Sequence, residues 1–404
     1  MQKKSKWRLA PLGMAVLACA GAQAQGGDSP FTFSGFATLG ATGTNSSIGE
    51  YAMTGQNRGA SKSWSGEVDS KLGVQLTAKA NQMFSGTVQV LSKQNGDGNF
   101  NPEVEWAFAK AQVMPSLSFR LGRMGAPFFA VSDFRDVGYA NTWLRPPLDV
   151  YGQVPISRFD GGDMIFQTNT GLGSLSAQLF VGKSNAVVQR TDVDFTSMKG
   201  FNGTLEMEGG LTLRVGYVRG KLTVKSASLN GLTATLRSVP IAAVSSVGDQ
   251  LDPNKKDASF AGVGLAWDQG EWLANFEYTQ RRTATYVPDT NAWYLTVGHR
   301  FGKFTPYATV SQIKQQDSNV NNTIPVGASP TLNALKAGVD GVVAGQYKEQ
   351  KTQAAGVRWD AYRNVAVKAQ LERITPKGPG FFINVPSTFN NRVTVYSLAV
   401  DMVF

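Results

Sequence analysis

The sequence has almost none of the residues that cross-link an exported domain or hold a metal. Cys19 and His299 are the only cysteine and the only histidine among 404 residues. Disulfides and a metal cage of histidine and cysteine are therefore excluded, and we expect no cofactor. Beyond the first 24 residues, no stretch of 18 consecutive apolar residues occurs, which excludes a bundle of membrane-spanning helices. Runs of strong helix formers are missing while glycine is abundant, so the composition favours an all-β chain.

The first 24 residues have the pattern of a secretory signal peptide. Four basic residues precede an apolar segment, residues 9–22, and Ala22-Gln23-Ala24 offers a cleavage site. We expect residues 1–24 to be removed and residues 25–404 to form one exported domain. The mature chain would keep 35 basic and 29 acidic residues, scattered along its length, so nucleic-acid binding has no support.

Apolar and polar residues alternate along most of the remaining chain, as in strands with two different faces. Residues 211–217, Leu-Thr-Leu-Arg-Val-Gly-Tyr, are typical. Sixteen segments of this kind are predicted: 31–44, 66–80, 84–94, 102–113, 117–127, 162–170, 174–183, 200–208, 211–224, 258–268, 272–284, 291–301, 304–315, 348–361, 364–375 and 391–404.

The connections between these segments alternate between short and long. Short ones, such as Gly209-Gly210 and Gly302-Lys303, hold two or three residues. The long ones include 45–65, 128–161, 184–199, 225–257, 316–347 and 376–390. Tight turns at one end and long loops at the other are typical of a transmembrane barrel with periplasmic turns and extracellular loops. A soluble β-sandwich has no reason for this pattern, and a propeller would show a repeat of 40 to 50 residues.

The last strand carries a further signal. Tyr396, Leu398 and Phe404 fall on one alternating apolar face, and the chain stops at the phenylalanine. This pattern resembles the signal by which outer-membrane barrels are recognised for insertion. We therefore expect these three residues to serve in assembly.

Across its mature length the chain resembles the Gram-negative general porins. The resemblance rests on sixteen strands, the opening Phe31-Thr32-Phe33-Ser34-Gly35-Phe36, the last strand, and Leu121-Gly122-Arg123 before the third long connection. It implies a 16-stranded antiparallel barrel whose third long loop, 128–161, folds into the lumen as a constriction. The usual Pro-Glu-Phe-Gly-Gly tip of that loop is absent, and residues 143–152 stand in its place.

What the resemblance implies about function is a water-filled channel for passive diffusion of small hydrophilic solutes and ions, weakly selective and without enzymatic activity. It also implies an outer-membrane homotrimer in contact with lipid and lipopolysaccharide, inserted by the barrel-assembly machinery. Two alternatives stay open. One is a substrate-specific channel for anions, carboxylates or sugars. The other is a barrel enzyme or adhesin, for which His299 and the long loops are the only support.

Charged residues on the predicted inner face and in the inserted loop are the candidates for lining the pore, because low-dielectric walls focus their field. They are Lys71, Glu103, Glu105, Arg120, Arg123, Asp133, Arg135, Asp136, Arg145, Asp149, Arg158, Asp160, Arg214, Arg358 and Lys368. Arg120 and Arg123 are three residues apart and would point to opposite faces. We expect a β-bulge at Gly122 to turn both inward, since an arginine facing lipid costs about 2–4 kcal/mol at the midplane.

Overall fold

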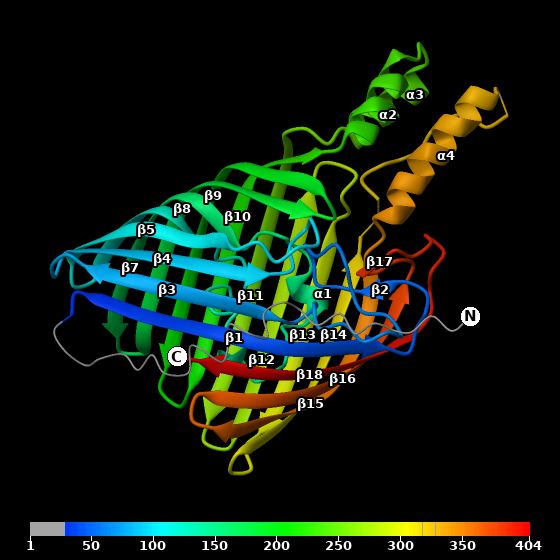
Figure 1. Ribbon diagram of the computed structural model, residues 1–404. Coiled ribbons are helices and arrows are strands. Elements are labelled where there is room, and N and C mark those ends of the chain that lie inside the picture. Colours follow the sequence, from blue (N-terminus) through cyan, green and yellow to red (C-terminus); the bar gives the residue numbers. More distant parts are fainter. Residues whose placement is uncertain (1–28, 317, 328) are drawn as a thin grey trace.

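The computed structural model describes residues 29–316, 318–327 and 329–404, so the predicted signal peptide lies outside the described residues. Within them, sixteen antiparallel strands form one closed barrel (Figure 1). Strand β1 (Phe31–Thr44) pairs with β3 (Lys71–Lys79) on one side and with β18 (Val393–Val403) on the other, so the last strand closes the barrel against the first. The predicted sixteen-stranded barrel is confirmed.

The other strands follow chain order around the wall. They are β4 (Phe84–Lys93), β5 (Glu103–Met114), β6 (Leu117–Gly125), β7 (Arg158–Thr170), β8 (Gly173–Val188), β9 (Thr191–Met207), β10 (Leu211–Lys225), β11 (Lys256–Gln269), β12 (Trp272–Thr283), β13 (Thr290–His299), β14 (Phe304–Gln315), β15 (Glu349–Tyr362) and β16 (Val365–Lys377). A separate pair, β2 (Glu50–Tyr51) and β17 (Phe382–Ile383), joins two long connections. We call the two ends of the barrel the short-turn end and the long-loop end.

The outer face of the barrel is apolar, and the inner face is mainly polar except where Phe159, Phe180, Phe195 and Phe260 pack with the connection between β6 and β7. On β10 and β11, Leu213, Val215, Val263 and Leu265 are 38–47% exposed, whereas Arg214 on the opposite face is 8% exposed. Sequence alternation alone does not say which face points outward. Exposed aliphatic side chains outside and polar ones inside are the arrangement of a barrel that lies in lipid.

One predicted long loop, residues 184–199, is instead part of two strands. Strands β8 and β9 continue past the expected ends and meet at Gln189 and Arg190, which both have positive φ (47° and 63°). Two such residues form the tight turn that suits a hairpin. The tip around Gln189 and Arg190 is polar, whereas Phe195 and Met198 are 5% and 1% exposed and belong to an apolar cluster inside the barrel.

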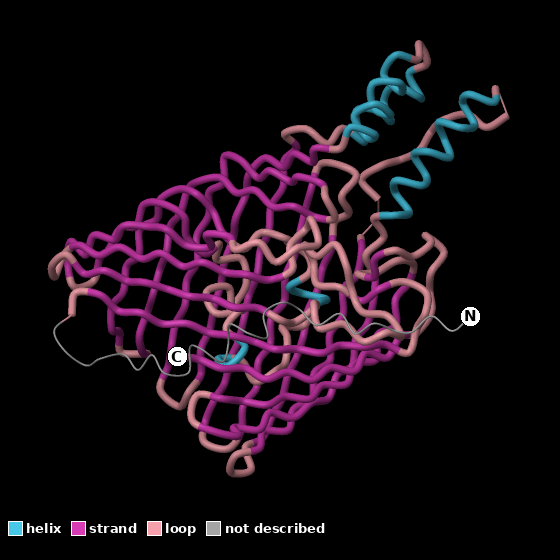
Figure 2. Tube along the Cα trace, viewed as in Figure 1, coloured by secondary structure: helices cyan, strands magenta, loops and turns pink. Residues whose placement is uncertain are grey.

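Two long connections carry helices that alternation did not predict. Helices α2 (Ala227–Ser238) and α3 (Ala242–Leu251) join β10 to β11, and α4 (Pro330–Gly345) joins β14 to β15. The Ser226 and Ser329 side chains cap α2 and α4 by accepting hydrogen bonds from the backbone. All three helices project from the long-loop end (Figure 2), and their apolar side chains share one cluster. No helix in the part of the chain that the structure describes is long and apolar enough to cross a membrane.

Candidate functional site

The connection between β6 and β7 folds into the barrel, where its helix α1 (Leu148–Tyr151) lies against the inner faces of β12 to β15 (Figure 1). We call residues 126–157 the inserted loop. It is shorter than the predicted 128–161 at its far end, because residues 158–161 already belong to β7. Arg158 and Asp160 are therefore wall residues and not loop residues.

Arg145, in the middle of the inserted loop, is 4% exposed and sits between two acidic groups of the wall. Its Nε and Nη2 atoms donate hydrogen bonds to Asp69 at 2.8 and 2.7 Å, and Nη1 pairs with Glu372. Nη2 also donates to Thr42 and Ser397. Burial alone would raise the pKa of Asp69, but the Arg145 guanidinium holds it below its usual range. Arg145 was expected to line the pore; the structure has it buried, where it fastens the loop to the wall.

Lys368 and Arg358 hold the loop through its backbone. Lys368 is fully buried, lies 2.9 Å from Asp401, and donates hydrogen bonds of 2.7–2.9 Å to three carbonyl oxygens, those of Gly138, Asn141 and Trp143. Arg358 donates to the carbonyls of Tyr139 and Asn141 at 2.6 and 3.0 Å. The Gly138 carbonyl also accepts from the Asn141 N–H at 3.0 Å, and for the other carbonyls the two cations satisfy groups that burial would otherwise leave unpaired.

Asp149 fastens the short helix α1. It is fully buried and accepts hydrogen bonds from Ser311, Gln350 and Thr352 at 2.6, 2.6 and 3.2 Å. Burial raises the pKa of Asp149 to about 6, although these three donors favour its charged form. Asp149 was expected to line the pore, but its carboxylate is buried against β14 and β15.

Arg214 and Glu277 hold the start of the loop. Arg214 donates to the carbonyl of Pro127 at 2.6 Å, and its nearest Glu277 oxygen is 3.9 Å away. Glu277 accepts hydrogen bonds from the Ala130 backbone at 2.9 Å and from the Tyr151 hydroxyl at 3.0 Å. The loop is thus attached to β10, β12 and β14 to β16 by buried polar contacts.

Across from these attachments, Asp136 of the loop faces two lysines of β3 and β4. Lys93 and Lys71 lie 2.9 and 3.4 Å from its carboxylate, and Arg135 lies 3.8 Å away. Burial alone would raise the pKa of Asp136, but Lys93 and Lys71 hold it well below its usual range. A cavity of about 210 Å³ lies between this part of the loop and the wall.

Arg158 extends the same charged wall. Its Nη2 and Nη1 atoms lie 2.6 Å from Glu103 and 2.9 Å from Glu105 on β5. The three residues line the 210 Å³ cavity together with the lysines. Glu103, Glu105 and Lys71 were expected on the inner face and Arg158 in the loop; in the structure all four border this cavity.

Arg120 lies on the wall, in β6, and Asp133 lies in the inserted loop. Arg120 pairs with Asp163 of β7 at 2.5 Å and stacks over the Phe108 ring at 5.2 Å. Asp133 is exposed and has no ion pair within the described residues.

Residues 12–378 match the sequence model of a family described as Gram-negative porin. This chain belongs to the Gram-negative porin family. It is an outer-membrane channel for passive diffusion. Comparison with curated protein sequences gives no match.

Three solved structures show the same fold as this porin. Salmonella typhi OmpF, in complex with daunomycin, has 14% identity over 93% of this chain and 97% of that chain, with a TM-score of 0.56. A loop L8 deletion mutant of OmpT, an outer-membrane protein of Vibrio cholerae, has 11% identity over 93% and 100%, with a TM-score of 0.54. An anion-selective porin from Comamonas acidovorans has 12% identity over 93% and 99%, with a TM-score of 0.53.

The predicted bulge at Gly122 is wrong. Strands β6 and β7 pair without a break from Leu117 to Gly125, so Arg123 shares the outer face with Leu121, which is 72% exposed. Arg123 lies 2.7 Å from Asp160, its register partner on β7. A paired charge is less costly on the outer face than a lone one, which removes the reason for the bulge. Neither residue faces the lumen of the porin.

The last strand carries the expected assembly residues on its outer face. Tyr396 and Leu398 are 43% and 53% exposed, and the Phe404 ring lies 6.3 Å from that of Phe33. His299, at the short-turn end, contacts the rings of Trp272 and Phe301 at 4.4 and 4.3 Å.

Several charged residues that contact the predicted ones were missed, among them Lys93, Asp163, Asp69 and Asp401. Lys93 and Asp163 stand on the inner phase of β4 and β7, and a search for partners of Asp136 and Arg120 on that phase would have found them. Asp69 precedes β3 in a segment without alternation, so no sequence signal pointed to it.

Proposed function

We propose that this porin is a weakly selective channel whose narrowest part lies between the inserted loop and the wall of β3 to β5. The observation that carries this proposal is the difference between two sets of contacts: the loop is fixed by buried groups on one side, whereas Asp136 meets β3 and β4 through the partly exposed Lys71 and Lys93. Buried contacts of Arg145, Asp149 and Lys368 draw the loop toward β14 to β18 and β1. The charged side chains on the opposite wall then border the cavity of about 210 Å³.

Weak selectivity follows from the charges around that cavity. Apart from the buried pair of Arg145 and Asp69, its lining contains four basic and four acidic residues, the bases being Lys71, Lys93, Arg135 and Arg158 and the acids Asp97, Glu103, Glu105 and Asp136. Opposed charges on two sides of a passage give a transverse field without a large net barrier to either ion. The excess of basic residues in the mature chain favours a slight preference for anions.

We further propose that the channel has no catalytic activity. His299 is the only histidine, and its ring packs between two aromatic rings on the outer side of the barrel, 3.4 Å from Glu271. A hydrolytic triad needs a serine or other nucleophile beside the histidine in an accessible place. The described contacts of His299 are two aromatic rings and Glu271, and no such nucleophile is among them.

We also propose that the porin is a homotrimer, inserted in lipid and lipopolysaccharide by the barrel-assembly machinery. Where β1 and β18 meet, Gly35 bears no side chain and lies beside the rings of Phe404 and Phe33, and the exposed Leu398 lies farther along the same outer face, opposite Ala41. Such a flat apolar surface suits contact with another subunit. Chemical crosslinking of the porin in membranes should yield trimers, and products no larger than a monomer would count against this assembly.

Cysteine modification tests the proposed constriction. Cys19 is the only cysteine and lies in the predicted signal peptide, so Lys71→Cys introduces a single reactive thiol. A charged methanethiosulfonate reagent should reduce single-channel conductance, and negative and positive reagents should shift the zero-current potential in opposite directions. Lys303→Cys, in an exposed turn at the short-turn end, is the matched control and should not respond. Modification of residue 71 without a change in conductance would place the constriction elsewhere.

A further inference from the structure

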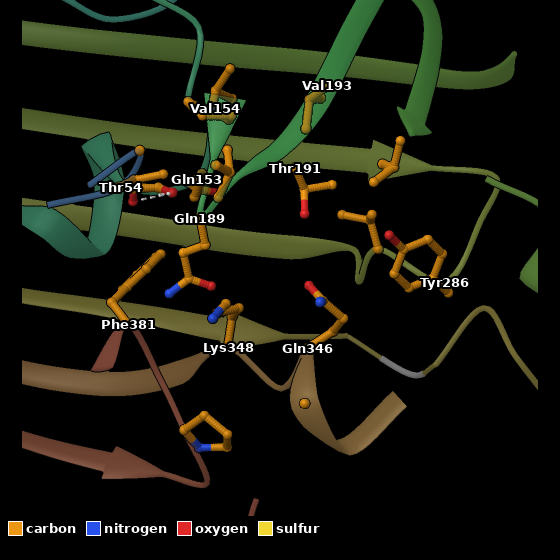
Figure 3. A pocket seen from close by; sticks show the side chains of 18 of the residues that line it. Thr54, Gln153, Val154, Gln189, Thr191, Val193, Tyr286, Gln346, Lys348 and Phe381 are labelled. Atoms are coloured by element: carbon orange, nitrogen blue, oxygen red, sulfur yellow. Dashed lines mark hydrogen bonds between the residues drawn. The ribbon is translucent and has the colours of Figure 1, made fainter. Parts of the chain in front are cut away.

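A second, larger cavity of about 740 Å³ lies at the long-loop end of the barrel. Its volume falls within the range of about 300–1,000 Å³ typical of small-molecule sites. Residues from α2 and α4 line it together with the inserted loop, the ends of β9 to β12 and the connection after β16 (Figure 3). The helices in the long loops therefore help to shape this cavity.

The lining combines apolar side chains with two cations and no acid. Apolar walls come from Phe128, Val193, Phe195, Leu229, Val342 and Phe381. Arg281 and Lys348 are the two charged residues, and no Asp or Glu belongs to the lining in the part of the chain that the structure describes. An unbalanced positive charge surrounded by apolar groups is costly unless an anion joins it.

Lys348, between α4 and β15, has no partner for its ammonium group. Its backbone N–H donates to Gln315 at 3.0 Å, but Nζ forms no hydrogen bond or ion pair with the described residues and lies 5.7 Å from the Phe381 ring centre. Figure 3 shows Lys348 with Gln189, Gln346 and Phe381 around the same space. Burial and the nearby Arg281 lower the pKa of Lys348 to about 8, which leaves it mostly protonated at pH 7.

Arg281, at the end of β12, is held in place but not neutralised. Nη1 donates to the carbonyl of Gln153 at 2.6 Å, and Nη2 and Nε donate to that of Pro288 at 2.8 and 3.2 Å. It has no ion pair within 4 Å among the described residues. A guanidinium has five N–H groups, so donors remain for a further acceptor.

We propose that this cavity binds a small carboxylate with an apolar ring, such as an aromatic acid, before it passes through the channel. The carboxylate would accept hydrogen bonds from Lys348 and Arg281, and the ring would lie against Phe381 and Val193. This site rests on the proposed diffusion function and adds a substrate class to it. A carboxylate without a ring would miss the apolar contacts, and a neutral aromatic would leave both cations unpaired.

Block of ion current by benzoate tests the site in planar bilayers. Benzoate added at the long-loop end should reduce the KCl current with a saturating concentration dependence, at a half-blocking concentration at least tenfold below those of acetate and benzamide. Lys348→Gln should raise the half-blocking concentration of benzoate at least tenfold. Lys303→Gln removes the same charge from an exposed turn and should leave it unchanged.

Two further variants separate binding from general damage. Phe381→Ala keeps both cations but removes part of the apolar wall, and it should also weaken benzoate at least tenfold. Lys348→Glu should abolish the benzoate block and create a block by benzylamine. If the KCl steps are normal but benzoate blocks no better than acetate or benzamide, the proposed binding site is wrong. The proposed diffusion channel would be unaffected by that result. Absence of KCl steps in the wild-type porin would instead overturn the proposed diffusion function.

Discussion

The guanidinium of Arg145 lies 2.7 Å from the carboxylate of Asp69, and both groups are almost completely buried. Glu372 approaches the same guanidinium from β16. One cation therefore joins the inserted loop to the segment before β3 and to β16, on either side of the β1–β18 pair. Removing one partner of a buried ion pair costs about 3–5 kcal/mol, because the other charge is left without compensation.

Arg145→Glu should release the inserted loop. The change places a third carboxylate beside Asp69 and Glu372, so repulsion replaces the attraction that holds the loop. We expect larger and noisier single-channel currents than in the wild type. Lys62→Glu, which reverses an exposed charge, should leave the conductance and the current noise as in the wild type. A quiet Arg145→Glu channel of wild-type conductance would show that this ion pair does not hold the loop.

The position of Arg145 marks the limit of what alternation could predict. Strand periodicity placed the loop between the fifth and sixth strands, because the strands before and after it alternate clearly. It also identified Arg145 and Asp149 as charged residues of that loop. Whether a loop charge faces water or a buried partner depends on Asp69 and Glu372, which lie 76 and 227 residues away in sequence. No local pattern encodes such distances.

Asp149 should make the stability of the porin depend on pH. Because burial raises its pKa to about 6, the stabilising preference for the protonated form is complete below the ordinary value near 3.8 and is lost as the pH rises through about 6. The difference amounts to at most about 3 kcal/mol. The midpoint temperature of the heat-induced shift in SDS gels should fall between pH 5 and pH 7.5. Asp149→Asn, which retains an acceptor for Gln350, should show a smaller fall, and an equal fall would exclude Asp149 as the cause.

Lys71 and Lys93 should set the ion preference at the proposed constriction. Reversing both to Glu adds two negative charges beside Asp136 and should move the zero-current potential toward cations. The shift should be larger at 0.1 M than at 1 M salt, because the Debye length shrinks from about 10 Å to about 3 Å. Reversal of Lys303 is the control. An identical potential in the double variant would place these lysines outside the ion path.

Other departures from the sequence predictions also have physical causes. The residue 184–199 hairpin and the three helices of the long loops were missed because neither shows the regular apolar–polar alternation on which the strand prediction depended. The outer-face pair of Arg123 and Asp160 was missed because each charge was judged alone, whereas strand register brings them together. The sixteen strands themselves were predictable because lipid outside and water inside impose alternation on every strand.

Phe404→Ser should lower the amount of porin in the outer membrane and leave conductance unchanged. The backbone of Phe404 exchanges two hydrogen bonds with Gly35, at 3.0 and 2.8 Å, and the variant keeps both. The lost side chain contributes about 1–3 kcal/mol by burial, too little to open so large a barrel. Quantification of the porin in outer-membrane fractions checks this, with Phe84→Ser, another exposed aromatic near the short-turn end, as control. Wild-type amounts of the Phe404 variant would exclude a role in assembly.

Current through single molecules in a planar bilayer decides whether this porin is a water-filled diffusion channel. We predict discrete steps that are linear in voltage and grow roughly in proportion to KCl concentration, because ions cross the lumen without saturating a binding site. Protein that is folded, as judged by its shift in gel mobility on heating, yet inserts without conducting would contradict passive diffusion. Steps that saturate well below 1 M KCl would contradict it as well.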